Sequence, residues 1–586
     1  MENQMENDPL FPGYQLPTQP AWRCSAKTEG FLTPIEDLMP QVLSILPRRV
    51  LPIIFLPGIM GSNLRLSAAR QREMGRNNNI SWRPDSVGQA KILLGGNPAM
   101  RQNQLDPLAT EVDEYNPVNN PTGDAEETAN MRHAIVTGNV SYALEVRIDT
   151  PLLIDDPVTA KPRKLRDQKA RERGWGEVFF KSYQDVLELC ERRLNTAFYG
   201  GNLDRWWKNI VDVPPVNWQA NPQPLLQPLD EATLKKTVTN CWFPVHAMGY
   251  NWLQSNQDSG VTVAKRITAL MKRYQDQGYQ CEKVIVVTHS MGGLVARALI
   301  HPKMGKMQDK VLGIVHGVMP AIGAAAAYKR MRCGFEDPGL NSLSPVVSTT
   351  AKVLGNFGTE VTAVLGNAQG GLGLLPSQAY GNYWLRVTHN GQRLKSLPQK
   401  GDPYEEIYKL RGKWYGLLRN EWINPARQDG AGYERSCLLL DQAKAFHNAI
   451  ASTYHDQSFA HYGADPNRAA WHNVVWALDD KAKVFDMEDL NIATDNGQGV
   501  MGVTDPRFPS RPGEEGPRFS ATMQAARDPG DQTVPLHSAE HQLRSGKFQG
   551  VFRQTGYEHQ NSYKDERALH STLYSLVRIA QTMTWS

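Results

Sequence analysis

Ser290 lies where residue types and spacing best fit a chemical role. The segment THSMGG, residues 288–293, gives it the pattern T-x-S-x-G, with Thr288 where the usual motif has glycine. The apolar or β-branched run 284–288 predicts a buried strand, and an apolar stripe after the glycines predicts a helix. A serine on the sharp turn between such elements exposes its hydroxyl to a base and an oxyanion site. We therefore predict a nucleophile elbow, with an ordinary strand-to-helix connection as the alternative.

An acid and a base for this serine are expected later in the chain, in the order serine, acid, histidine. Asp531 lies in DPGDQTVPLHSA, a turn where backbone amides can hold a carboxylate that faces a histidine. His559 follows a strand-like stretch, residues 551–555, and a glycine turn, so its imidazole can reach Ser290 from a loop. We predict these two as acid and base, and His289 as a residue that packs in the turn. The less well placed rivals are Asp505, Asp528, His537, His541 and His570.

The oxyanion of an acyl-transfer reaction needs two N–H donors. Residues 50–64, VLPIIFLPGIMGSNL, predict a buried strand and then a glycine-containing loop. We expect the amide of Ile59 or Met60 in that loop to act together with the amide of Met291, the residue after the serine. A plain tight turn is the alternative for this loop. The chemistry requires no metal and no organic cofactor.

The elements that must position these residues alternate between strands and helices. A strand within residues 243–256 precedes an amphipathic helix, the elbow strand and a further strand at residues 310–318. This order predicts an α/β fold with a mostly parallel central sheet and helices on both faces. We expect an N-terminal extension at residues 1–47. The core is expected from 48–70, 238–335 and 471–586, with a first insertion at 71–237 and a second, cap-forming insertion at 336–470.

Composition sets broad limits on function. The chain has 586 residues, 21% of them charged, and a net charge of +4, which argues against a nucleic-acid binder. The first residues, MENQMENDPLFPGYQLP, lack the basic and apolar regions of a Sec signal peptide, so we expect synthesis in the cytoplasm without Sec export. The cysteines lack C-x-x-C spacing and are expected to be buried thiols: Cys24, Cys190, Cys241, Cys281, Cys333 and Cys437.

Five motifs in one order resemble the lecithin:cholesterol acyltransferase-like and GPI-deacylase-like lipases of the α/β-hydrolase superfamily. They are PGIMGS, GYNW, HSMGG, GDQTVPL and GYEHQNS. The segments ARERGWGEVFFKSYQDVLELCERRL, VHGVMPAIGAAAAYKRMRCGFE and LLPSQAYGN look more closely like the antibacterial phospholipase effectors of type VI secretion systems. That resemblance implies delivery into the periplasm of a target cell, a secretion-apparatus spike component as carrier, a membrane phospholipid substrate and a cognate immunity protein.

The resulting interpretation is a phospholipase or lipase that uses Ser290, His559 and Asp531. Residues 346–375 have apolar positions at helical spacing and hinge-like glycines, which makes them a candidate lid, with fixed core packing as the alternative. Two other classes of protein remain open. One is an intracellular lipid acyltransferase or housekeeping esterase with the same triad, and the other is a catalytically silent binding module of the hydrolase fold.

Overall fold

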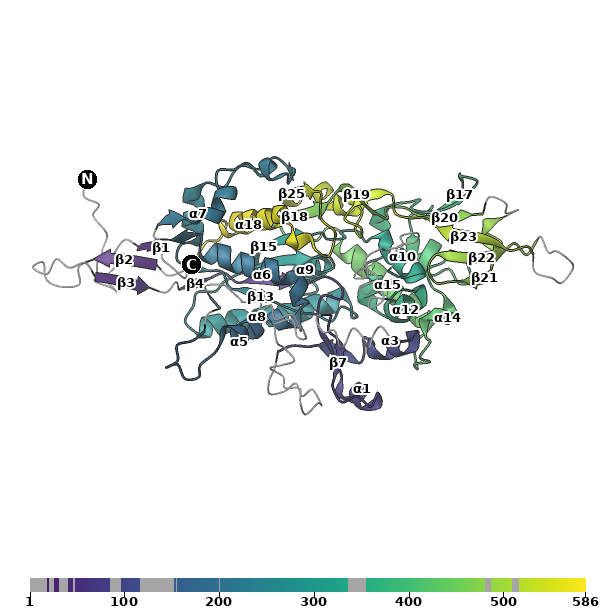
Figure 1. Ribbon diagram of the computed structural model, residues 1–586, viewed down its shortest axis with the longest axis horizontal. Helices are drawn as coiled ribbons and strands as arrows, with labels where there is room; N and C mark the ends of the chain where they lie inside the picture. Colours follow the sequence, from purple (N-terminus) through teal and green to yellow (C-terminus); the bar gives the residue numbers. More distant parts are fainter. Residues whose placement is uncertain are drawn as a thin grey trace, which may run out of the picture.

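A seven-stranded sheet runs through the centre of the computed structural model (Figure 1). Its order is β11-β25-β18-β15-β14-β5-β13, and all neighbours are parallel except β11, which is antiparallel to β25. The strands are β5 (Ile53–Leu56), β11 (Pro222–Gln223), β13 (Val245–Ala247), β14 (Val284–His289), β15 (Val311–Gly317), β18 (Ser458–Gly463) and β25 (Phe548–Gln554). The predicted, mostly parallel central sheet is confirmed.

The structure describes residues 18–20, 26–30, 41–45, 48–84, 96–115, 152–153, 155–199, 201–335, 355–479, 486–507 and 516–586. Strands β1 (Thr18–Pro20), β2 (Ala26–Gly30) and β3 (Gln41–Ile45) form an antiparallel sheet at the N-terminal end of the molecule. Short pairings join β4 (Arg49–Val50) to β12 (Cys241–Trp242), β6 (Leu64–Leu66) to β7 (Ile80–Trp82) and β8 (Thr110–Val112), β9 (Phe198–Tyr199) to β10 (Asn202–Leu203), and β19 (Asp465–Ala470) to β24 (Asp528–Gly530).

Helices cover both faces of the central sheet because its strands are apolar on both sides. In β14, Val284 and Val286 join the apolar cluster that contains α8 (Asn256–Asp276) and α9 (Gly292–Ile300). The alternate residues Ile285 and Val287 join the cluster that contains α6 (Phe180–Asn195) and α18 (Glu566–Ala580). Side chains alternate along a strand, so one continuous apolar run fills two cores.

Helix α6 lies within the range 71–237 that the sequence analysis assigns to the first insertion. It packs on β13 and on α18, so it belongs to a helical layer of the central sheet. Glu191 of α6 is fully buried and accepts a hydrogen bond of 2.9 Å from the backbone N–H of Val245 in β13. This charge-assisted bond fixes the helix against the sheet. Within the described residues before the elbow, the other α-helices besides α8 are α1 (Ala68–Glu73), α3 (Pro98–Gln104), α5 (Arg166–Glu172) and α7 (Glu231–Val238).

A second, six-stranded sheet forms the opposite end of the molecule from β1–β3 (Figure 1). Its order is β17-β16-β20-β23-β22-β21. The strands are β16 (Leu385–His389), β17 (Gln392–Leu397), β20 (Val474–Leu478), β21 (Asn491–Asp495), β22 (Val500–Thr504) and β23 (Phe519–Met523). Strands β20 to β23 thus lie within the predicted core range 471–586, whereas β18 of the central sheet lies within the predicted insertion 336–470.

A set of helices lies between the two sheets and includes the described helices of the candidate lid. They are α10 (Ala325–Cys333), α12 (Gly358–Leu365), α13 (Gln369–Leu372), α14 (Asn420–Ile423) and α15 (Tyr433–Ile450). Helix α12 packs against α10, α3 and α14, and Val361 is 2% exposed. The structure therefore favours fixed packing for residues 355–375, and residues 346–354 lie outside the described residues. Within the described part of the chain, every helix is too short or too polar to cross a membrane.

Candidate active site

The turn after β14 holds Ser290 in an unusual backbone conformation. Its φ is 53°, a left-handed value that non-glycine residues seldom adopt, and its N–H donates to the carbonyl of Gly317 at 2.8 Å. At Gly292 a Cβ atom would lie 2.5 Å from the carbonyl oxygen of Leu56, so this position admits no side chain. The chain therefore turns sharply into α9, and the serine stands at the N-terminal end of that helix. Thr288, in place of the motif glycine, is a buried strand residue.

The structure brings His559 and Asp531 together with Ser290. His559 Nε2 lies 2.8 Å from Ser290 Oγ, and His559 Nδ1 lies 2.8 Å from Asp531 Oδ2. The second carboxylate oxygen of Asp531 accepts the N–H groups of Thr533 at 3.1 Å and Val534 at 2.7 Å. Turn amides and the imidazole thus share one buried carboxylate. This arrangement lets the imidazole accept the serine proton while the carboxylate orients it.

The rival acids and bases lie elsewhere. Asp528 accepts the backbone N–H groups of His472 and Asn473, at 3.2 and 3.1 Å. Asp505 accepts from the N–H and the guanidinium of Arg507. The remaining three histidines lie outside the site. His537 bonds to the carbonyl of Tyr380, and His570 packs on Trp206 and Trp218. His541 is the first residue of the short helix α17 (His541–Arg544), which follows α16 (Leu536–Ala539).

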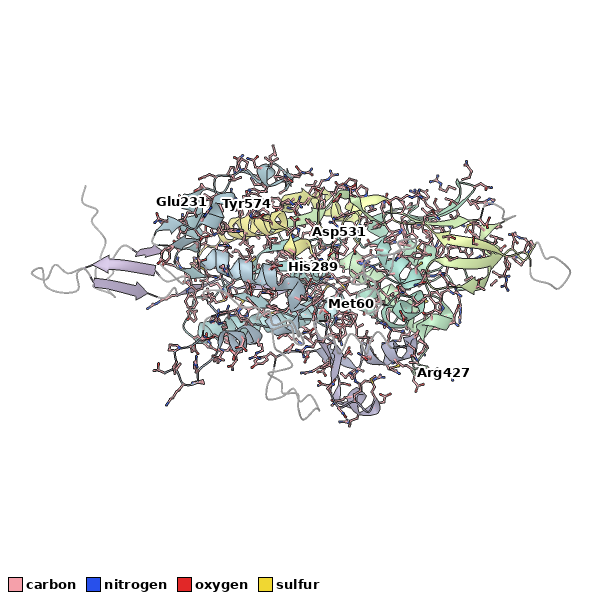
Figure 2. The ribbon with its side chains drawn as sticks, in the orientation of Figure 1. Met60, Glu231, His289, Arg427, Asp531 and Tyr574 are labelled. Atoms are coloured by element: carbon pink, nitrogen blue, oxygen red, sulfur yellow. The ribbon has the colours of Figure 1, made fainter. Side chains whose placement is uncertain are left out.

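The loop after β5 lies against the elbow. Gly58 and Gly61 close a turn through a 3.0 Å bond from the N–H of Gly61 to the carbonyl of Gly58, and Met60 has a φ of 60°. Trp82 Nε1–H donates to the carbonyl of Met60 at 2.7 Å, and the Tyr250 hydroxyl donates to the carbonyl of Pro57 at 2.7 Å. Side chains from two other segments, Trp82 and Tyr250, thus hold the carbonyl groups of Met60 and Pro57 in this loop. Figure 2 shows Met60, His289 and Asp531 gathered near the middle of the molecule.

Two of the predicted oxyanion donors lie in this loop and the third lies beside the serine. Among the described residues, no intramolecular hydrogen bond occupies the backbone N–H of Ile59, Met60 or Met291. The N–H of Ser290, in contrast, is bound to Gly317. Amides that have no internal partner and lie beside a nucleophile can bind a developing negative charge.

The site is nearly closed to solvent. Ser290 is 5% exposed, His559 is 8% exposed and Asp531 is fully buried. Burial also lowers the pKa of the neighbouring His289 to about 3, with the positive potential of His559 as a second cause. His289 therefore stays neutral at physiological pH.

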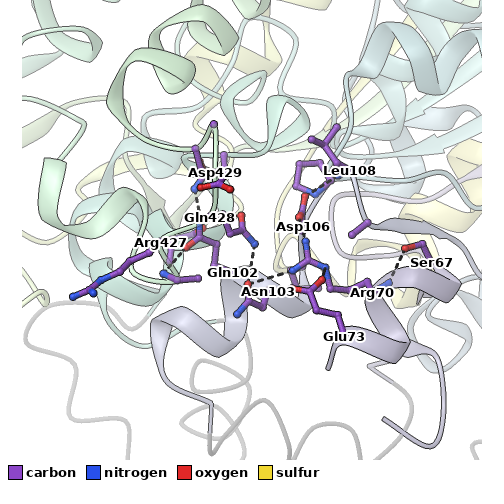
Figure 3. Close-up of a pocket in the computed structure, with 18 of the residues that line it drawn as sticks. Ser67, Arg70, Glu73, Gln102, Asn103, Asp106, Leu108, Arg427, Gln428 and Asp429 are labelled. Atoms are coloured by element: carbon purple, nitrogen blue, oxygen red, sulfur yellow. Dashed lines mark hydrogen bonds and ion pairs between the residues drawn. The ribbon is translucent and has the colours of Figure 1, made fainter. Parts of the chain in front are cut away.

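A polar cleft of about 610 Å³ lies apart from Ser290 (Figure 3). It is formed by the segments around α1 and α3, by α12, and by residues 426–435. Its side chains largely bond to one another: Gln428 Nε2 donates to Asn103 Oδ1 at 3.0 Å, and Arg70 pairs with Asp106 at 2.6 Å. In Figure 3 the side chain of Arg427 points away from the cleft. The bond between Gln428 and Asn103 joins α3 to the segment 426–435, and the lining mixes polar side chains with apolar ones such as Leu105 and Leu108.

Sequence reasoning missed Tyr183, whose hydroxyl lies 3.1 Å from His289 Nδ1 and 3.2 Å from the N–H of Gly58. The residue occurs on an amphipathic helix, which the sequence does show. No local signal links it to a site 106 positions away. Only the placement of α6 against the sheet reveals the contact.

The fold and the site together define an α/β-hydrolase, with a nucleophile turn after a central parallel strand and an acid and a histidine on later loops. Residues 246–335 match the PGAP1-like alpha/beta domain. The chain is also similar to a solved structure described as "The crystal structure of Tle4-Tli4 complex". It has 30% sequence identity and a TM-score of 0.70 to that chain, and the match covers 92% of this chain and 99% of the other. No curated protein shows significant sequence similarity.

The chain belongs to the same family as Tle4. The predicted resemblance to the lecithin:cholesterol acyltransferase-like and GPI-deacylase-like group of α/β-hydrolase lipases, and most closely to the type VI secretion phospholipase effectors, is confirmed. The match to the PGAP1-like domain spans α8, β14, the elbow, α9, β15 and α10.

Proposed function

We propose that this protein is a serine-dependent phospholipase that hydrolyses carboxylic esters of membrane phospholipids. The observation that carries the proposal is the contact of His559 with both Ser290 Oγ and Asp531, each at 2.8 Å. Ser290 on its strained turn is the nucleophile, His559 the base and Asp531 the group that orients the imidazole. Membership of the lipase family supports the ester substrate.

The reaction follows from these roles. Ser290 Oγ attacks the ester carbonyl and its proton passes to His559 Nε2, while the amides of Met291 and of Ile59 or Met60 hold the oxyanion. The C–O bond to the alcohol then breaks, and His559 returns the proton to the departing alcohol oxygen. Water, deprotonated by the same imidazole, attacks the acyl-enzyme and releases the fatty acid with Ser290 restored.

We further propose that the enzyme is an antibacterial toxin, carried by a type VI spike component into the periplasm of a target cell. Tle4 was solved as a complex with Tli4. By analogy, we propose that a cognate immunity protein binds this chain. Periplasmic expression should therefore kill cells, and co-expression of the immunity protein should protect them. Survival of unprotected cells, with the enzyme active in vitro, would favour a housekeeping esterase.

The test of the activity is fatty-acid release from mixed phospholipid vesicles by the wild type, Ser290→Ala and Ser575→Ala. Ser575 is a matched control, because it is a fully buried serine on α18 whose hydroxyl bonds only to the carbonyl of Ser571 in the same helix. We expect Ser290→Ala to lose activity by several orders of magnitude and Ser575→Ala to retain it. Transfer of the acyl group to a lipid acceptor instead of water would indicate an acyltransferase.

Labelling with a fluorophosphonate separates the remaining outcomes. If the wild type labels at Ser290 but does not hydrolyse vesicles, the triad works and the substrate class is wrong. If Ser290 neither labels nor hydrolyses esters, the chain is a silent hydrolase-fold binding module.

A further inference from the structure

Helix α6 contacts both catalytic loops of the site. Tyr183 on this helix bonds to Gly58 in the oxyanion loop and to His289 beside the nucleophile. Its neighbour Ser182 accepts a 2.7 Å hydrogen bond from the side chain of Gln560, the residue after the base. One turn of one helix thus touches three chain segments that meet at the site.

His289 continues this connection to the base. Its Nε2 lies 2.9 Å from the backbone carbonyl oxygen of His559, and its ring lies between Tyr183 and His559, at centroid distances of 5.3 and 5.2 Å. The N–H of His559 in turn donates to the carbonyl of Asp531 at 2.9 Å. Both main-chain polar groups of the base are therefore held in place.

The donor and acceptor roles along this path have one solution. A carbonyl can only accept, so Nε2 of His289 must carry a proton and donate it to the carbonyl of His559. Because the ring is neutral, its Nδ1 is an acceptor and takes the hydroxyl proton of Tyr183. The N–H of Gly58 then donates to the oxygen of Tyr183. Every buried polar atom on this path has a partner, which is the condition under which a polar network makes a site rigid.

Close packing around Gly58 leaves no room for the side chains of this hydrogen-bonded path to rearrange. A Cβ atom at Gly58 would lie 2.8 Å from His289 Nδ1 and 3.0 Å from the Cβ of Ser290. His289 is 1% exposed and Tyr183 is fully buried, so water does not compete for these bonds.

We propose that Tyr183 and His289 form a hydrogen-bond relay that sets the position of the base relative to the oxyanion loop, which makes both of them positioning residues for the reaction. The proposal rests on the proposed function and adds to it. Neither residue exchanges a proton with substrate. Their effect is on geometry, since a base displaced by about 1 Å costs on the order of 10²-fold in rate.

The test compares Tyr183→Phe, His289→Phe and His289→Gln with the control Tyr574→Phe. Tyr574 is a buried tyrosine on α18 whose hydroxyl donates to the carbonyl of Gln227 at 2.7 Å, away from the site. Hydrolysis of a soluble nitrophenyl ester avoids any effect of vesicle binding. We expect kcat to fall roughly 10-fold in Tyr183→Phe and roughly 100-fold in His289→Phe, with KM within about threefold. His289→Gln keeps a donor for the carbonyl of His559 and should retain more activity than His289→Phe.

The pH profile distinguishes positioning from loss of structure. A loosened His559 is less well held against Asp531, so the acid limb of kcat/KM should move to lower pH in the His289 variants and stay unchanged in Tyr574→Phe. Equal kcat and equal pH profiles in the relay variants and the control, at matched melting temperature, would overturn the proposal. If His289→Phe does not fold, Tyr183→Phe and His289→Gln carry the test.

A measurement without turnover separates this proposal from the proposed function. In protein with ¹⁵N-labelled histidine, the relay requires a neutral Nε2–H tautomer at His289 that does not titrate between pH 5 and 8. An Nδ1–H tautomer or a titrating ring would refute the relay, even if Ser290 proves to be the nucleophile. If the tautomer is as expected but the wild type hydrolyses no ester, the proposed function fails and the relay stands as a structural feature.

Discussion

Replacement of Asp531 by asparagine tests the triad most directly, because the surroundings of the carboxylate dictate how the new side chain must sit. One oxygen of Asp531 accepts two backbone N–H groups, from Thr533 and Val534, and the other faces His559 Nδ1. An asparagine amide group cannot face two N–H donors, so its oxygen must take that position. Its NH₂ group then points at His559 and donates to Nδ1.

That orientation forces the wrong tautomer on the base. When Nδ1 accepts a hydrogen bond, the neutral imidazole carries its proton on Nε2, the atom 2.8 Å from Ser290 Oγ. The imidazole then cannot accept the serine proton. Loss of the correct tautomer in such a triad costs on the order of 10³- to 10⁴-fold in kcat, or about 4 to 5.5 kcal/mol of transition-state stabilisation. The two hydrogen bonds from the backbone N–H groups of Thr533 and Val534 are retained, so the free energy of unfolding should change little.

The assay is kcat/KM for a soluble ester at pH 7, with melting temperatures measured in parallel. Asp528→Asn is the matched control, because Asp528 lies three residues before Asp531 on the same segment. Its carboxylate accepts the backbone N–H groups of residues 472 and 473 and not a bond from His559. The reasoning fails if Asp531→Asn loses less than tenfold in kcat/KM, or if the control loses as much.

Three further predictions concern the scaffold. Arg297 is 2% exposed, and its guanidinium donates to the carbonyl of Ile450 at the end of α15 and to three other carbonyls. Each buried carbonyl that loses its donor costs about 1–3 kcal/mol, so Arg297→Met should lower the free energy of unfolding in urea by several kcal/mol. A decrease below about 1 kcal/mol would contradict this prediction. Gly292→Ala should nearly abolish fluorophosphonate labelling, because its Cβ would lie 2.5 Å from a carbonyl oxygen; unchanged labelling rates would show that the turn can adjust. Burial lowers the pKa of His316 to about 3. Between pH 6.5 and pH 3 this histidine is protonated in the unfolded chain but neutral in the folded protein. The free energy of unfolding therefore decreases as the pH falls, by up to about 1.4 kcal/mol per pH unit for this residue. His316→Gln should flatten the pH dependence of the free energy of unfolding, and an unchanged pH dependence would contradict this prediction.

The sequence by itself determined the parts of the fold that depend on local pattern. The apolar run before Ser290 and the stripe after it specify a strand, a turn and a helix, and these elements follow directly from periodicity. The turn at Asp531 could also be predicted from the sequence, because its carboxylate bonds to backbone N–H groups only two and three residues further along the chain. Even the order of the motifs along the chain was sufficient to indicate the family.

Tertiary structure alone decided how the remaining segments are used. Strand β18, SFAHYG, contains Ser458 and His461, which are polar yet fully buried, so its composition does not mark it as a central strand. Residues 358–372 have the pattern of an amphipathic lid, but packing against α3, α10 and α14 buries them.

The relay is the clearest case of a feature that sequence cannot show. It joins Tyr183 to His289 across 106 positions, and His289 to His559 across 270. Hydrophobic periodicity reports which face of an element is buried, but it carries no information about the partner on the other side. Those partners are set by the way the helices pack on the sheet, and only the folded chain brings them within hydrogen-bond distance.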